Sequence, residues 1–383
     1  MNWNLNIQRQ LTPSLSVTVG YVGSHTVHST MTTDTSNSVG FNNGQVQTSP
    51  NGLLQWPCGP DGSGSNCVVG FLPTGTTAAP KATQTYNAFV GQLRPTFWMG
   101  TSKYNGLQAQ LSKKFSHNLQ GEASFTWSNC TDNASGGDIG DPFTNSYSSL
   151  MFFNKASVYG KCDFDINKNF VANLIYDIPT PKSMSSGALN YLVGGWEVGG
   201  ILSMSTGTPF TLSMGGDPVG VNNGDSQTWV NRLPNCNPIN SNYRSTLQYV
   251  NTACFTPPAV ATSAVSSLPY ACAPYTGAGA PPSGQTFCAN LFGNNGRNSV
   301  VGPGLANFDF LAFKNNYIKK ISESFNIQFR AEMFNVFNRA NFGPPLTTES
   351  IFNQDGSTAG AAGVLDQTST TPREIQFGLK VIW

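Results

Sequence analysis

The chain has 383 residues, only 10% of which are charged, and its net charge at pH 7 is +1. Globular proteins average about 25% charged residues, and the near-neutral balance argues against nucleic acid or an acidic partner as the main target. The 40 glycines and 24 prolines indicate turns and long loops, and no run of about 18 apolar residues predicts a membrane-spanning helix.

Nine segments alternate apolar and polar side chains with the period of two that is typical of a β-strand. In chain order, the strands are predicted at residues 2–10, 15–21, 107–112, 119–127, 164–176, 196–204, 308–318, 324–337 and 375–383. The pattern is cleanest from Leu119 to Trp127. It is ambiguous in the seventh strand, where Phe310, Leu311 and Phe313 are all apolar.

The strand from Ser324 to Phe337 has one apolar side and one side too polar for a packed core. A soluble sheet buries its apolar side, whereas a membrane barrel turns that side to lipid and its polar side to a water-filled lumen. One strand cannot distinguish these two environments, so the spacing of all nine must decide.

The connections alternate between short and long, and the long ones cover residues of about 24–103, 128–163, 206–305 and 338–372. Bacterial outer-membrane barrels have short periplasmic turns and long extracellular loops. We therefore predict an all-β, transmembrane antiparallel barrel whose long connections lie outside the cell.

Aromatic residues occur at both ends of the predicted strands, as in the two aromatic girdles of a membrane barrel. Those near the long connections are Trp3, Tyr21, Tyr104 and Trp127, and those near the short turns are Phe115, Tyr176, Trp196 and Trp383. The alternative interpretation is that they are core aromatics of a soluble sandwich.

Eight cysteines all fall in segments rich in Gly, Pro, Ser or Asn, and none forms a CxxC pair. A zinc site is disfavoured, and disulfides in an oxidising compartment are favoured. Eight cysteines allow 105 connectivities, but pairing of sequence neighbours keeps each bridge within one connection. The predicted pairs are Cys58 with Cys67, Cys130 with Cys162, Cys236 with Cys254, and Cys272 with Cys288.

The sequence contains no HExxH, GxSxG or GxxxxGK[ST] motif, which disfavours an enzyme. The acidic runs at residues 132–141 and 215–225 have oxygen ligands that suit calcium, but neither has the spacing of an EF-hand. We predict no catalytic residue, no cofactor site and no metal site.

Nine strands do not close a bacterial single-chain barrel, which uses an even number, and an open edge in lipid leaves backbone groups unpaired. The first ten residues also lack the basic start and apolar centre of a signal peptide. We therefore expect residues 1–383 to be the C-terminal part of a longer barrel protein.

Six sequence blocks in one register resemble the barrel end of TonB-dependent receptors of the Oar-like type. They include YNGLQAQLSKKFSHNLQGEASFTWS, FNIQFRAEMFNVFNRANFGPP and REIQFGLKVIW, and the six blocks cover residues 104–128, 162–179, 194–212, 292–315, 325–345 and 373–383. The resemblance implies a barrel of about 22 strands, of which these are the last nine. It also implies a regulatory-like domain, a plug and a TonB box, all absent here, and hence a TonB complex as partner through that missing part.

Members of this family end on an aromatic residue, usually Phe, in a strand that the barrel-assembly machinery binds. The residues that resemble this signal here are Phe377, Leu379, Val381 and Trp383. Trp in place of Phe is a departure from the family pattern.

The leading functional hypothesis is active transport of a large solute across the outer membrane of a Gram-negative bacterium, with lipid around the barrel. The candidate lumen wall comprises Gln108, Gln110, Glu122, Asp165, Asn173, Asn326, Arg330 and Glu332. Most such residues in a barrel are hydrated wall rather than ligand contacts. One alternative is a surface or adhesion protein that displays disulfide-bonded loops. Another is a soluble β protein such as a carbohydrate-binding module, which would have to expose its apolar faces or bury unpaired polar groups.

Overall fold

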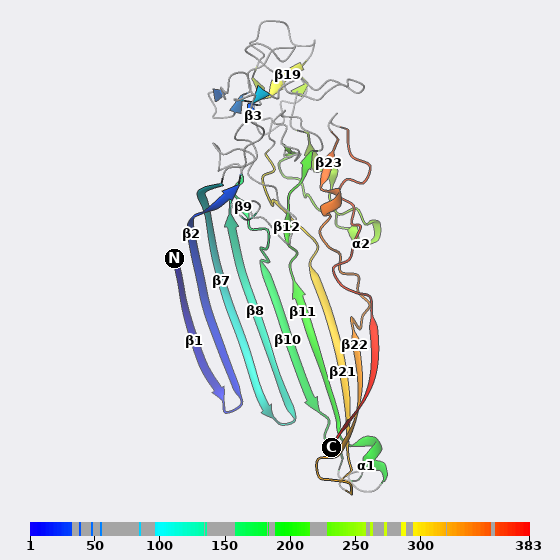
Figure 1. The fold of residues 1–383 in the computed structure, drawn as a ribbon. Helices are drawn as coiled ribbons and strands as arrows, with labels where there is room; N and C mark the ends of the chain where they lie inside the picture. The colour runs from blue at the N-terminus through cyan, green and yellow to red at the C-terminus, as the bar shows by residue number, and fades with distance from the viewer. Residues whose placement is uncertain are drawn as a thin grey trace.

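The computed structural model describes residues 1–32, 96–133, 135, 158–181, 183, 188–214, 228–257, 294–318, 320–353 and 357–383, and short strand segments at 38–39, 47–48, 54–55, 84–85, 261–262, 272–273 and 285–288. Nine antiparallel strands form one sheet in chain order (Figure 1). They are β1 (Asn2–Thr12), β2 (Leu15–Thr32), β7 (Thr96–Ser116), β8 (Leu119–Asp132), β10 (Lys168–Asp177), β11 (Trp196–Ser205), β21 (Leu305–Tyr317), β22 (Asn326–Phe334) and β24 (Glu374–Ile382).

All nine predicted strands are present, but several of their ends differ from the prediction. β2 and β7 stay paired as far as Thr32 and Thr96, so residues 24–32 and 96–103 are strand rather than loop. The register shifts near Ser29 break the alternation there, which explains why the pattern hides this extension. β10 and β22 are shorter than predicted.

Two short turns join the first four long strands. Residues 13 and 14 separate β1 from β2, and His117 and Asn118 separate β7 from β8 with φ of 51° and 61°. Two positive φ values define a type I′ turn, whose twist matches that of the flanking strands. The register shifts only next to the two turns, between Gln10 and Thr12 and between Lys113 and Ser116, and each hairpin keeps one register beyond that point.

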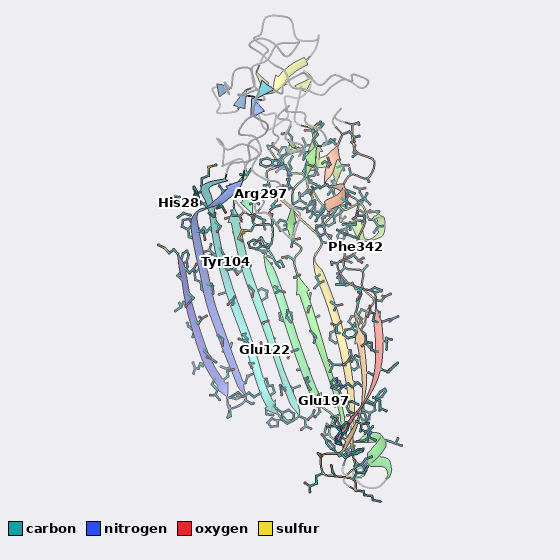
Figure 2. The ribbon with its side chains drawn as sticks, viewed as in Figure 1. His28, Tyr104, Glu122, Glu197, Arg297 and Phe342 are labelled. Carbon is teal, nitrogen blue, oxygen red and sulfur yellow. A yellow bond between two sulfur atoms is a disulfide. The ribbon has the colours of Figure 1, made fainter. Side chains whose placement is uncertain are left out.

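The helix α1 (Ala188–Val193) lies in the connection between β10 and β11, at the short-connection end of the sheet (Figure 1). Figure 2 shows Glu197 near this end and Arg297 at the other. No helix in the described part of the chain is both long enough and apolar enough to cross a bilayer.

Small elements fill the long connections. In the first lie β3 (Ser38–Val39), which pairs with β6 (Gln84–Thr85), and β4 (Gln47–Thr48), which pairs with β5 (Leu54–Gln55); β9 (Gly160–Lys161) pairs with β8. In the last two lie β12 (Pro209–Phe210) with β20 (Val300–Val301), β15 (Asn231–Arg232) with β16 (Phe255–Thr256), β13 (Ser213–Met214) between β14 (Thr228–Trp229) and β23 (Ser350–Phe352), and β19 (Gln285–Cys288) with β17 (Ala261–Thr262) and β18 (Cys272–Ala273). The helices there are α2 (Tyr243–Thr246), η5 (Thr252–Cys254) and η6 (Leu346–Thr348).

The sheet has no buried apolar side of the kind that a soluble sheet packs. On β1, Leu5 and Ile7 are each 65% exposed, and on β24 Phe377 and Leu379 are 69% and 72% exposed. Contiguous apolar patches on this scale occur on surfaces that face a membrane or a partner. The apolar side of the sheet is therefore built to face another apolar medium.

The hydrophobic core of the chain lies instead in the last two long connections. We call the described residues of 206–257, 294–304 and 335–373 the cap. Its buried core comprises Phe210, Leu212, Met214, Val230, Tyr249, Val250, Cys254, Phe255, Val300, Ile351, Phe352, Ala362 and Leu365. The sequence predicts both segments as irregular loops, because side chains buried by long-range contacts leave no period in the sequence.

Candidate functional site

One face of the sheet carries a continuous set of polar side chains. Directly paired residues of neighbouring strands lie on the same face, so the register carries this face from β7 to β22 through the pairs Ser112 with Glu122, Glu122 with Asn173, Asn173 with Ile201, Ile201 with Asp309, and Leu311 with Glu332. Seven of the eight predicted wall residues share this polar face, namely Gln108, Gln110, Glu122, Asn173, Asn326, Arg330 and Glu332.

Hydrogen bonds across the strands hold these polar side chains. Gln110 Nε2 donates to Glu122 Oε1 at 2.7 Å. On the last strands, the amides of Asn326 and Gln328 both donate to Asn315 Oδ1 at 2.9 Å, and Arg330 Nε donates to Gln328 Oε1 at 2.7 Å. Asn315 and Gln328 are not among the predicted wall residues, although both belong to the same alternating phase.

Asp165 was predicted as a wall residue, and the structure corrects this. β10 begins at Lys168, so Asp165 lies in the turn before it and is only 3% exposed. Its carboxylate accepts the Cys130 N–H at 2.8 Å and pairs with Lys161 Nζ at 3.0 Å. The alternating pattern continues beyond the end of β10, and for this reason the sequence predicts Asp165 as part of the strand.

The register also resolves the ambiguous phase of β21. Phe308, Phe310 and Ala312 share the apolar face, while Leu311 and Phe313 lie on the polar face. The Arg330 guanidinium lies 5.0 Å from the centre of the Phe313 ring, so the ring takes part in a cation–π contact there. The polar face therefore includes apolar surface as well as hydrogen-bonding groups.

The cap is a packed unit rather than a set of separate loops. Tyr249 lies in its core, donates its hydroxyl to the Val301 carbonyl at 2.6 Å and meets the Tyr243 ring edge-on at 4.9 Å between centroids. Burial, and to a smaller degree the neighbouring Tyr243, raises the pKa of Tyr249 above its ordinary value. The Cys236–Cys254 disulfide joins the end of η5, directly before β16, to the segment that precedes α2.

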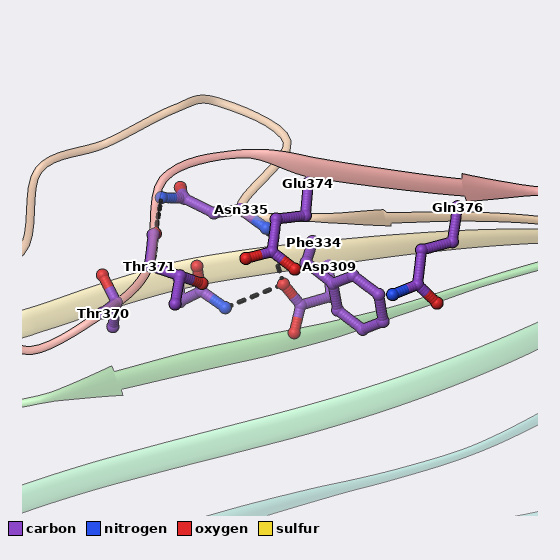
Figure 3. A pocket seen from close by; sticks show the side chains of 8 residues that line it. Asp309, Phe334, Asn335, Thr370, Thr371, Glu374 and Gln376 are labelled. Atoms are coloured by element: carbon purple, nitrogen blue, oxygen red, sulfur yellow. Dashed lines mark hydrogen bonds between the residues drawn. The ribbon is translucent and has the colours of Figure 1, made fainter.

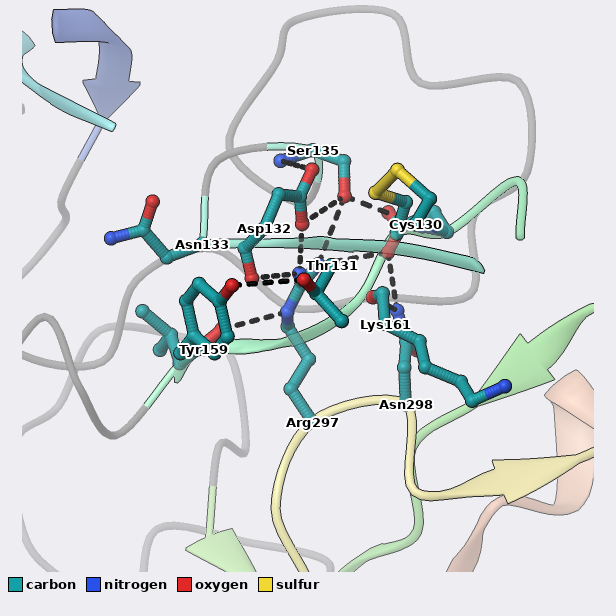
Figure 4. A network of polar contacts seen from close by, with 12 residues as sticks. Cys130, Thr131, Asp132, Asn133, Ser135, Tyr159, Lys161, Arg297 and Asn298 are labelled. Atoms are coloured by element: carbon teal, nitrogen blue, oxygen red, sulfur yellow. Dashed lines mark hydrogen bonds and ion pairs between the residues drawn. A yellow bond between two sulfur atoms is a disulfide. The ribbon is translucent and has the colours of Figure 1, made fainter. Parts of the chain in front are cut away.

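A buried ion cluster, the Arg297 clamp, joins the cap to the connection between β8 and β10 (Figure 4). Arg297 Nη1 pairs with Asp163 Oδ1 at 2.9 Å, Nη2 contacts Asp132, and Nε donates to the Val158 carbonyl at 2.8 Å. The side chains of Arg297 and Asp163 are each 1% exposed. Buried charges persist only when they are paired and hydrogen-bonded, so this arginine fixes two connections to each other.

Among the cysteine side chains that the structure describes, both predicted disulfides are present, Cys130–Cys162 beside the clamp and Cys236–Cys254 in the cap. The backbone register of β18 and β19 sets Cys272 opposite Cys288. Cys58 and Cys67 lie outside the described residues, as does the acidic run at 215–225. In the part of the chain that the structure describes, no group of three His, Cys, Asp or Glu side chains is arranged to hold a metal ion.

A pocket of about 420 Å³ lies on the polar face where β21, β22 and β24 meet the cap (Figure 3). Its lining residues are Asn307, Asp309, Phe334, Asn335, Thr370, Thr371, Glu374 and Gln376. Asp309 Oδ1 accepts both the Asn335 N–H and the Asn307 amide at 2.8 Å. No motif in the sequence indicated this pocket, because the three strands contribute one or two residues each.

The predicted assembly signal lies on the edge strand. Phe377, Leu379 and Val381 share the apolar face of β24, and Trp383 follows in the same phase with 87% of its surface exposed. Within the described residues, β1 and β24 each pair on one side only. Stacking of Phe377 on Phe329, with centroids 6.0 Å apart, orders the apolar face at this edge.

These features match a known protein family. Residues 1–376 match the family model described as outer membrane beta barrel domain, so the chain belongs to that family and lies in the outer membrane of a Gram-negative bacterium. In a barrel of this family the exposed apolar face meets lipid and the polar face looks inward. The curated proteins include no match to this chain.

Two solved structures are similar to the chain. The outer membrane transporter YddB from Escherichia coli aligns with 100% of this chain and 32% of its own, at 8% identity and a TM-score of 0.42. FpvA of P. aeruginosa, solved with bound heterologous pyoverdines, aligns with 100% of this chain and 27% of its own, at 9% identity and a TM-score of 0.39. The chain spans about a third of the first and about a quarter of the second.

Proposed function

We propose that this chain forms the C-terminal part of the barrel of a TonB-dependent outer-membrane transporter that passes a large solute. The observation that carries the proposal is the single polar face that runs by register from β7 to β24, opposite a face with many exposed apolar side chains. A pore through lipid needs both faces on every strand. Family membership and the Oar-like sequence blocks support the same assignment.

The seven wall residues of the polar face line the lumen in this proposal. The Asn315, Gln328 and Arg330 side chains add to the wall through their hydrogen bonds. The cap lies at the long-connection end of the sheet, outside the cell, where it screens or captures the solute. Preformed binding surfaces avoid the entropy cost of ordering loops on binding, and the packed core of the cap supplies such a surface.

The rest of the barrel belongs to strands beyond these nine. In a chain-order antiparallel sheet of nine strands, the first and ninth strands run in the same direction, so closing β1 on β24 would need a parallel pair. Bacterial single-chain barrels are antiparallel with even strand numbers, and lipid tolerates no open edge. Coupling to TonB and insertion by the barrel-assembly machinery through Phe377 to Trp383 are parts of this proposal.

Solute depletion from the growth medium tests transport without knowledge of the solute. Mass spectrometry compares media after growth of wild-type cells, a strain that lacks the gene and the complemented strain, each with and without a protonophore. We expect at least one solute whose depletion is lost on deletion, restored by complementation and abolished by the protonophore. Identical media from all strains would contradict transport.

A second function, display of the cap at the cell surface, is favoured by one observation, the packed and disulfide-bonded core of the cap. Display predicts that deletion lowers attachment of cells to surfaces while the media stay identical. It also predicts that cells still attach after a protonophore collapses the proton gradient of the inner membrane, because adhesion needs no energy coupling.

A further inference from the structure

The pocket at the mouth of the polar face has the chemistry of a cation site. Asp309 and Glu374 bring two carboxylates into it from β21 and β24, and they lie beside the Phe334 ring (Figure 3). None of the eight lining residues is Lys, Arg or His. Arg373 precedes Glu374, but its guanidinium donates to the Val336 carbonyl. The pocket therefore has a net negative charge with no internal counter-charge.

Besides the two carboxylates, the pocket holds a buried amide oxygen as an acceptor. The Asn307 amide nitrogen is used by Asp309, and the Asn335 amide nitrogen donates to the carbonyls of Arg339 and Thr371 at 3.1 Å. The Asn307 Oδ1 atom is buried without a hydrogen-bond partner. A buried acceptor of this kind lacks a donor, and an ammonium group offers three donors and no acceptor.

The carboxylate that faces the ligand is held in place before any ligand arrives. Asp309 Oδ1 accepts the Asn335 backbone N–H and the Asn307 amide, each at 2.8 Å. Asn335 itself is 3% exposed, and its side chain bonds the backbone of Arg339 on both sides. Fixed acceptors bind a charged donor more strongly than mobile ones because less conformational entropy is lost.

We propose that this pocket binds the ammonium group of an organic amine, with Asp309 and Glu374 as its counter-charges and the Phe334 ring against its apolar part. Charge-assisted hydrogen bonds and cation–π contacts both favour this ligand. A neutral polyol forms no ion pair with the two carboxylates, and an anion is repelled by them. Glu332 pairs with Gln376 in the register, so another carboxylate follows along the same face.

Titration calorimetry on the full-length protein in detergent tests the site with three four-carbon ligands and one metal ion. The four-carbon ligands are 1,4-diaminobutane, 1,4-butanediol and succinate, and the metal ion is supplied as calcium chloride. We expect the diamine to bind at one site, with binding weakened by salt, and the other three to bind at least about tenfold more weakly. Equal binding of the diol, tighter binding of calcium, or no binding of the diamine would overturn the proposal.

Variants then locate the binding. Asp309→Asn and Glu374→Gln should each weaken diamine binding about tenfold or more, while Glu323→Gln, an exposed carboxylate at the short-connection end, should leave it unchanged. Unchanged binding in both pocket variants would also overturn the proposal. The ligand series on the unaltered protein needs no variant, so the test holds even where a variant fails to assemble.

This inference rests on the proposed function only for the position of the pocket on the solute path. Binding in detergent needs no energised membrane. Diamine binding without any transported solute would therefore refute the proposed transport and leave the amine site standing. Transport of a solute with no diamine binding would refute the amine site and leave the proposed transport standing.

Discussion

Arg297 and Asp163 are 134 residues apart in the chain and form an ion pair of 2.9 Å between Nη1 and Oδ1, buried under the cap. Asp132 is the second carboxylate on the same guanidinium. The two aspartates and the arginine leave one negative charge, and Asn298 Nδ2 donates to Asp163 at 2.6 Å to offset it in part. Arg297, from the connection between β11 and β21, is thus held by the end of β8 and by residues of the connection between β8 and β10.

Replacement of Arg297 by Ala should loosen the cap without unfolding the sheet. Two buried carboxylates then lose their partner, and breaking a buried pair in this way costs about 3–5 kcal/mol. Limited proteolysis and urea unfolding in detergent measure the change. Arg244→Ala is the matched control, since Arg244 is an exposed cap arginine with one hydrogen bond, to the Ala340 carbonyl. Equal proteolysis rates for the two variants would argue against the clamp.

Loss of the Cys236–Cys254 bridge should lower the stability of the cap. The bridge closes a separation of 18 residues, and a loop of about that length is worth roughly 3 kcal/mol. The Cys236→Ser, Cys254→Ser double variant should therefore unfold at lower urea than the oxidised protein. Mass spectrometry of a non-reduced digest checks the remaining pairs, Cys58 with Cys67 and Cys272 with Cys288, and free thiols at all eight positions would contradict the framework.

The stability of the cap should fall above pH 10 because of Tyr249. Its pKa is raised in the folded state, so its contribution is complete below the unfolded value of about 10 and is lost as pH rises beyond that value, where only the unfolded chain ionises readily. Urea midpoints at pH 8 and at pH 11 measure the drop. Tyr249→Phe should lose about 1 kcal/mol at pH 8 with the hydrogen bond to Val301 and show a smaller drop with pH.

Equal pH dependence in Tyr249→Phe and the unaltered protein would show that other groups cause the alkaline loss. Tyr317→Phe serves as the control and should keep the pH dependence of the unaltered protein, because Tyr317 lies at the end of β21, away from the cap, and is 55% exposed.

Replacement of Trp383 by Ala should reduce the amount of folded protein in the outer membrane, because it removes the last aromatic of the apolar face of β24. Trp383→Phe should retain it. Ile382→Ala is the control, since Ile382 pairs with Asn326 on the polar face. Quantitative immunoblotting of outer-membrane fractions measures all three, and equal levels in Trp383→Ala and the unaltered protein would argue against the assembly signal.

The strands were predictable from the sequence because their signal is local. Leu119 to Trp127 alternates without error. The structure pairs it in a single register with β10, and from Gly121 onward in a single register with β7. The alternation also places seven of the eight predicted wall residues on the polar face. Its failure at Asp165 has a simple cause, since the pattern continues past the point where the backbone turns.

The cap and the pocket were not predictable in this way. Phe210 and Ile351 are both fully buried in one core, but they come from connections separated by two strands of the sheet, β21 and β22. The residues next to Phe210 and Ile351 in the sequence show no pattern that predicts this shared core. The same holds for Arg297, whose partners lie more than 130 residues earlier, and for Asp309 and Glu374, which only the register brings together.

The central claim is that alternate residues of these strands meet lipid and water. Spin labels at Leu107, Gln108, Leu379 and Lys380, introduced one at a time in the protein reconstituted into bilayers, test it directly by their accessibility to oxygen and to a water-soluble nickel complex. We predict that the labels at Leu107 and Leu379 are relaxed by oxygen and those at Gln108 and Lys380 by the nickel complex. The same accessibility at neighbouring positions, or the reverse assignment, would contradict the account.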